Sequence, residues 1–204
     1  MRLATQLTGE EYVRDRYWEK ATLDRCPEHP EGGCGLRRHS PYPRARPAGT
    51  WVARYYCPTA RVTFSLLPDF LASHLPGTLA EIEAVVAEVE AGETIEAVAT
   101  RLRPEVQLPA AVRWVRRRIG YVRRALSVTP GLLPALFAGI ELSLRAFAAV
   151  LRTSAVLAAL RVRMPSYLMR IASPFGLRRW LRGSGVAVEP LQQRRGAERR
   201  GADP

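Results

Sequence analysis

The pattern of hydrophobic residues changes near residue 79, and this change constrains the fold more than any other feature of the 204-residue chain. Before it, residues 22–67 are rich in Pro, Gly, Cys and Arg and contain only short β-prone runs. After it, apolar residues recur at spacings of three and four, the period of an amphipathic helix. The sequence therefore predicts a mainly α fold with a small N-terminal β-hairpin, in a chain long enough for one domain or two small ones.

The clearest β-prone pieces form a candidate hairpin. Thr50–Tyr56 reads TWVARYY and Arg61–Leu66 reads RVTFSL, and the turn CPTA separates the two runs. Short runs of β-branched and aromatic residues on either side of such a turn are typical of paired strands. Pro68 ends this piece, because proline cannot donate to the ladder of a central strand.

Beyond the hairpin, the spacing of apolar residues predicts three helices in the order of a helix-turn-helix module. They run from Leu79 to a break at Gly92, over Ile95–Leu102, and from Pro109 to about Leu126. The sequence Thr-Pro-Gly at 129–131 is expected to end the third helix. The turn of Arg103–Leu108 is longer than the roughly three or four residues of a tight helix-turn-helix.

The rest of the chain completes a division into five segments. Residues 132–152 and 154–163 read as two apolar helices with few charges on any face, which favours packing or self-association as a homodimer. The last residues have almost no apolar content and are expected to be disordered. The segments are an N-terminal segment (1–21), a zinc-ribbon-like segment (22–76), a helix-turn-helix domain (77–128), a helical packing domain (129–188) and a disordered basic tail (189–204).

Cysteine and histidine residues gather before residue 60 in a pattern that suggests a metal site. Cys26 and His29 have the spacing that lets a tight turn aim two ligands at one ion. Cys57 opens a second turn, but the expected ligand three residues later is Ala60. Two other residues could complete a tetrahedral set, Cys34 and His39. The candidate ligands of one structural zinc are Cys26, His29, Cys34 and Cys57. The alternatives are a ribbon that keeps its fold without metal, or cysteines that serve as small hydrophobic residues.

The charge is divided unequally between the two halves of the chain. Residues 1–100 carry 11 basic and 14 acidic side chains, a net of −3, whereas residues 101–204 carry 20 basic and 5 acidic side chains, a net of +15. A GC-rich genome would explain the preference for arginine over lysine, but not its position. The basic half points to an anionic partner, either nucleic acid or an anionic membrane surface.

The third predicted helix, PAAVRWVRRRIGYVRRAL, has one apolar stripe and an arginine-covered outer face. The stripe that should pack on the other two helices is Val112, Val115, Ile119, Val122 and Leu126. The arginines expected to contact double-stranded DNA are Arg113, Arg116, Arg117, Arg123 and Arg124. Arginine can bond guanine edges in the major groove or hold phosphates. The alternative is an ordinary solvated helix face. The distribution of charge argues against it, because residues 101–124 contain eight arginines and one glutamate, whereas the two preceding helices carry glutamate.

Several classes of protein are disfavoured. After residue 100 the acids are too few, and too concentrated in the tail, to hold the two metal ions of a ribonuclease-H-type transposase. No glycine-rich phosphate loop or nucleophile elbow is present, so we expect no enzymatic activity. The N-terminus lacks the apolar stretch of a secretory signal, which favours a cytoplasmic location. The longest apolar region, 131–160, is interrupted by charges, so a membrane span is not expected.

Three strings of the chain resemble an uncharacterised family of bacterial mobile-element proteins. They are CPEHPEGGCGLRRH at 26–39, RYYCP at 54–58 and TFSLLPDFL at 63–71, and PFGLRR at 174–179 is similar as well. In that family a zinc-ribbon-like pair of turns precedes a helix-turn-helix, as at the N-termini of some insertion-sequence transposases. The resemblance implies binding to the DNA of element ends or of a promoter. Ala60 departs from the pattern at an expected ligand position.

The sequence thus favours a non-catalytic, DNA-binding accessory or regulatory protein of a mobile element. Two other interpretations stay open. The chain could be a peripheral membrane or interaction protein whose apolar helices insert or pair while its arginines meet anionic lipid. It could also be the remnant of a longer transposase, as Ala60 and the missing carboxylates suggest.

Overall fold

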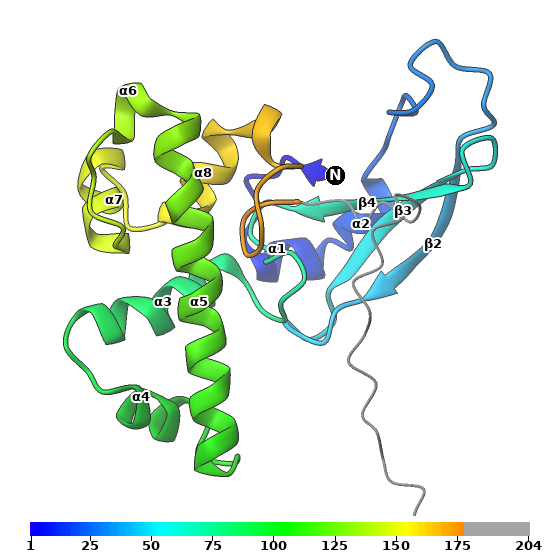
Figure 1. The fold of residues 1–204 in the computed structure, drawn as a ribbon. Coiled ribbons are helices and arrows are strands. Elements are labelled where there is room, and N and C mark those ends of the chain that lie inside the picture. The colour runs from blue at the N-terminus through cyan, green and yellow to red at the C-terminus, as the bar shows by residue number, and fades with distance from the viewer. Residues whose placement is uncertain (178–204) are drawn as a thin grey trace, which may run out of the picture.

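The computed structural model describes residues 1–177 of the chain. Its N-terminal part contains a four-stranded mixed sheet rather than a hairpin alone (Figure 1). The strands are β1 (Arg2–Leu3), β2 (Arg37–Pro43), β3 (Trp51–Cys57) and β4 (Val62–Pro68), in the order β1-β4-β3-β2. β1 runs parallel to β4, and the other pairs are antiparallel. The predicted hairpin is confirmed as β3 and β4. The mainly α prediction missed β2, because Pro41 and Pro43 obscure its pattern, although an edge strand tolerates proline.

Two short helices, α1 (Gly9–Arg14) and α2 (Tyr17–Lys20), pack on one face of the sheet. Tyr12 of α1 is fully buried, its ring 5.4 Å from that of Phe70, and its hydroxyl donates to the Trp51 carbonyl at 3.1 Å. These contacts form an N-terminal core that also contains the three cysteines.

The second part of the chain is helical, with α5 crossing its centre (Figure 1). Its helices are α3 (Leu79–Glu90), α4 (Ile95–Leu102), α5 (Leu108–Leu132), α6 (Pro134–Phe137), α7 (Leu144–Leu151) and α8 (Val156–Arg163). α3 and α4 confirm the first two predicted helices. One large hydrophobic cluster joins all six helices to the end of the sheet, and the predicted stripe of α5 is buried within it.

Two predicted helix boundaries are wrong. α5 continues through Pro130 to Leu132, because a proline in the last turn removes only one backbone donor. The helix ends before Pro134, because a residue that precedes proline disfavours the helical conformation. The region 132–152 is not one helix, since Gly139 adopts a positive φ of 71° and Ser143 begins α7 as an N-cap. The predicted tail 189–204, and residues 178–188 of the predicted packing domain, lie outside the described residues.

Two glutamates of α3 cap later helices. Glu90 accepts the backbone N–H groups of Leu144 and Arg145, at 3.0 and 3.3 Å, at the start of α7. Glu83 accepts the N–H of Leu157 at the start of α8. A carboxylate is stabilising at a helix N-terminus, where backbone donors are unpaired. Burial nevertheless raises the pKa of Glu83 to about 7.

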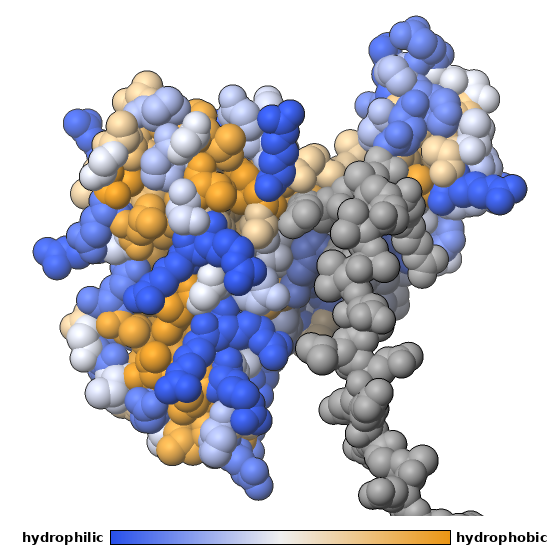
Figure 2. All heavy atoms as spheres, in the orientation of Figure 1, coloured by the Kyte–Doolittle hydropathy of each residue, from blue (hydrophilic) through white to orange (hydrophobic). Residues whose placement is uncertain are grey.

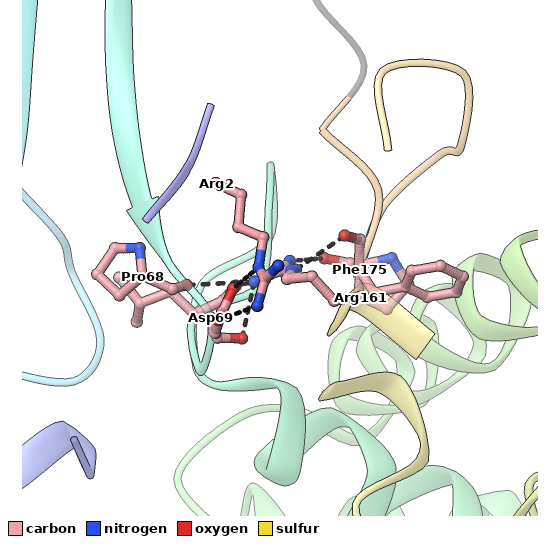
Figure 3. Close-up of polar contacts among 7 residues, drawn as sticks. Arg2, Pro68, Asp69, Arg161 and Phe175 are labelled. Carbon is pink, nitrogen blue, oxygen red and sulfur yellow. Dashed lines mark hydrogen bonds and ion pairs between the residues drawn. The ribbon is translucent and has the colours of Figure 1, made fainter. Parts of the chain in front are cut away.

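A buried arginine joins the helical part to the sheet (Figure 3). Arg161 of α8 is 0% exposed and its guanidinium donates only to backbone oxygens. The acceptors are the carbonyls of Phe175, Pro68, Asp69, Leu71 and Pro174, at 2.9, 3.2, 2.9, 2.6 and 2.9 Å. Beside it, Arg2 binds both carboxylate oxygens of Asp69, at 2.7 and 2.9 Å. Arg161 therefore fixes the end of β4 against the loop that follows α8.

Candidate metal centre and candidate nucleic-acid interface

The four predicted metal ligands meet at one end of the sheet. Cys26, His29 and Cys34 lie in the loop between α2 and β2, and Cys57 is the last residue of β3. Their ligand atoms all lie within 4.8 Å of one another. The three cysteines are buried and unbridged, and His29 is half-buried. The cluster is thus compatible with one structural metal ion.

The distances within the cluster fit a tetrahedral ion. His29 Nδ1 lies 3.6 Å from Cys26 Sγ and 3.5 Å from Cys57 Sγ. A tetrahedral zinc with Zn–S of about 2.3 Å and Zn–N of about 2.0–2.1 Å would place sulfur and nitrogen about 3.6 Å apart. The imidazole and two of the thiols therefore already have the spacing that such an ion requires.

Of the two candidates for the fourth position, Cys34 lies in the cluster and His39 does not. His39 is exposed on β2, with its ring 6.2 Å from that of Tyr56. Ala60, where a ribbon ligand was expected, instead donates its backbone N–H to Cys57 Sγ at 3.3 Å. The fourth member of the cluster therefore comes from the loop before β2 and not from the turn after β3.

The thiols influence one another strongly. The pKa of Cys26 is lowered to about 7. Burial alone would raise it, but hydrogen bonds from His29 and from the Glu28 backbone outweigh the effect of burial. Burial and the two neighbouring thiols raise the pKa of Cys34. Three thiolates side by side would repel one another, and a bound cation would remove this conflict because its positive charge neutralises them as the thiol protons are released.

The five arginines predicted to contact DNA are all exposed on α5: Arg113, Arg116, Arg117, Arg123 and Arg124. Figure 2 shows the hydrophilic band that runs over this helix beside hydrophobic surface. Among the ion pairs of residues 1–177, only Arg116 of the five takes part, with Glu96 at a long 3.7 Å. Four of the five therefore carry charge that no carboxylate of the described chain neutralises.

The turn that leads into α5 brings further basic residues to its side. Arg103 lies in that turn and Arg118 on α5, and both guanidiniums approach Trp114, at 5.3 and 3.6 Å from the ring centre. Trp114 is half-buried, so it packs against the hydrophobic cluster of the helical part as well as against these two arginines. Helical periodicity placed Arg118 beside the apolar stripe but gave no sign of its 6% exposure, and Arg103 lies outside any periodic pattern.

Within residues 1–177, no helix combines the length and the hydrophobicity that crossing a membrane requires. Comparison of the chain with protein-family models, with curated proteins and with solved structures found no match. The resemblance to mobile-element proteins therefore rests on the sequence strings alone.

Proposed function

We propose that this protein is a non-catalytic, DNA-binding accessory or regulatory protein of a mobile element, which binds double-stranded DNA through the outer face of α5. The observation that carries the proposal is the row of exposed arginines on that helix, four of them without a carboxylate partner in the described chain. α4 and α5 pack together, joined by the turn 103–107, as the two helices of a helix-turn-helix do. The buried stripe on the opposite side of α5 holds the helix firmly against the core.

The arginines would act first through phosphate neutralisation. Each phosphate contact releases counterions, so the slope of log affinity against log salt is about −0.9 per contact. Five contacts would give a slope of about −4.5, which makes binding strong at low salt and weak at high salt. Arginines that reach base edges would add sequence preference to this attraction.

The metal centre would serve the fold rather than the chemistry. We propose that zinc is the ion, because three thiolates and one imidazole are a structural zinc set with no open coordination position. The ion would tie the loop that carries Cys26, His29 and Cys34 to the end of β3. This loop has too few apolar residues to form a core without it.

Self-association is part of the proposal. Leu136, Leu142 and Val150, near the α6–α7 end of the helical part, are 46, 44 and 44% exposed, and a second copy of the chain could cover them. A dimer would present two copies of α5 to two half-sites of DNA.

The test is fluorescence anisotropy with labelled random double-stranded DNA at about 50 and about 200 mM salt. The variant combines Arg113→Ala, Arg117→Ala and Arg124→Ala, all on the outer face of α5. We expect it to lose at least tenfold in affinity and to show a slope shallower by about 2.7.

A matched control removes the same charge elsewhere. Arg145, Arg163 and Arg170 are exposed outside α5, and their combined replacement by alanine is expected to leave the slope nearly unchanged. Equal losses in both variants would show that only net charge matters. No binding by the wild-type protein at low salt would overturn the proposal and favour the membrane or remnant interpretation.

A further inference from the structure

A hollow lies against the side of α5, between its first turns, the turn 103–107 and the loop that precedes α3. Its volume is about 280 Å³. Basic side chains dominate its polar lining, and Trp114 forms part of its wall. The arginines that line it are Arg103, Arg113, Arg117 and Arg118.

Among residues 1–177, no acidic residue lines this hollow. Two carboxylates lie near it: Glu105 binds Arg103 at 2.7 Å and is itself largely exposed, and the charge of Glu81 acts on Arg118. Four guanidiniums around one small space repel one another unless an anion joins them. The arrangement therefore fits a ligand that carries at least one negative charge.

Arg118 is the residue whose surroundings most favour such a ligand. Its residue is 6% exposed, its guanidinium stacks 3.6 Å from the centre of the Trp114 ring, and its hydrogen bond in the structure is a long one, 3.4 Å, to the Pro76 carbonyl. Burial, followed by the charge of Arg103, lowers the pKa of Arg118 to about 10. A buried charge costs free energy unless it is paired and hydrogen-bonded.

Arg161 provides an internal comparison. It is buried even more deeply, at 0% exposed, but five backbone carbonyls accept from its guanidinium, so the protein itself supplies its acceptors. Arg118 has one weak acceptor and lines an open space. Arg161 is a structural residue, whereas the donors of Arg118 remain available to a ligand.

We propose that this hollow binds a phosphate group, held by Arg118 and Arg103 with Arg113 and Arg117 at its outer edge. Guanidinium groups bind phosphate oxygens through paired N–H donors, and several arginines around one group are the usual arrangement. The inference extends the proposed function, because a DNA-backbone phosphate beside α5 would be one source of the group. A small phosphorylated molecule would be the other.

The experiment follows tryptophan emission of the full chain during titration with inorganic phosphate and pyrophosphate at constant ionic strength. We expect a saturable change that chloride does not produce and that Trp114→Phe abolishes. Arg118→Met keeps the apolar stem and removes the charge, and it should weaken binding at least tenfold. Arg103→Gln, in the turn, should also weaken phosphate binding. It keeps the proposal testable should Arg118→Met fold poorly. Arg145→Gln, on α7, is the control and should bind as the wild type does.

The two sources are separated by competition with DNA. Displacement of labelled DNA by phosphate, together with weaker DNA binding by Arg103→Gln, would assign the site to the backbone. Saturable phosphate binding in a protein that does not bind DNA would support the phosphate site, with a small phosphorylated molecule as its source, and would refute the proposed function alone. The absence of a saturable change, or wild-type binding by both Arg118→Met and Arg103→Gln, would overturn the inference.

Discussion

Replacement of Arg161 by methionine is expected to destabilise the protein by about 4 kcal/mol. The substitution keeps most of the aliphatic stem but removes a guanidinium that reaches five backbone carbonyls. Three of these carbonyls share the two hydrogens of Nη1, so the loss amounts to about four full hydrogen bonds from a charged donor. Bonds of this kind contribute about 1.5–3 kcal/mol each, so the gross loss is at least about 6 kcal/mol.

Part of that loss is offset because the variant no longer buries a charge. Burial lowers the pKa of Arg161 from 12.5 to about 10, which corresponds to about 3 kcal/mol against the charged form. The hydrogen bonds still outweigh this cost. Two of the five carbonyls keep another donor, since Pro68 also accepts from the Leu71 N–H and Pro174 from the Ser73 N–H. The net loss of about 4 kcal/mol is a large share of the roughly 5–15 kcal/mol by which a domain is stable.

The assay is urea unfolding followed by circular dichroism, with the free energy of unfolding extrapolated to water. Arg163→Met, two residues later on the same helix but exposed, is the control and should change stability by less than about 0.5 kcal/mol. A loss below about 1 kcal/mol in Arg161→Met would refute the reasoning, because the carbonyls would then find other donors at little cost.

Two further predictions concern the metal centre and a buried carboxyl. Cys57→Ser is expected to abolish binding of one zinc per chain and to lower the thermal midpoint of unfolding, whereas His39→Asn should retain the ion. The zinc content of each variant is measured after gel filtration. Equal zinc content in both variants would contradict the ligand set. Because burial raises the pKa of Glu83 from 4.5 to about 7, its contribution to stability is complete below about pH 4.5 and is lost as the pH rises through about 7. Glu83→Gln should therefore be more stable than the wild type at about pH 8, by up to about 3 kcal/mol, and nearly equal to it at about pH 4. Urea unfolding of both proteins at both pH values tests this. The same difference in the free energy of unfolding between variant and wild type at about pH 8 and at about pH 4 would refute it.

The sequence alone predicted the features that depend on neighbouring residues. The starts of α3 and α4 follow from the spacing of their apolar residues. The structure adds a cap to each, since the hydroxyls of Thr78 and Thr94 accept backbone N–H groups of the first turn, at 3.1 Å in both cases. The apolar stripe and the arginine face of α5 follow from helical geometry, which separates them on opposite sides of one helix. The spacing of Cys26 and His29 follows from one tight turn.

Features that depend on distant segments were decided by the tertiary structure. Cys34 rather than His39 joins the cluster, because the path of the loop before β2 sets which side chain reaches Cys57. The spacing of these residues along the sequence does not determine this. Arg161 and Arg118 look alike in sequence, as arginines on basic helices. One meets five carbonyls from segments up to 93 residues away, and the other meets an indole and an open hollow. Local patterns determine which residues face inward, but only packing determines whether a buried charge finds its partners within the chain.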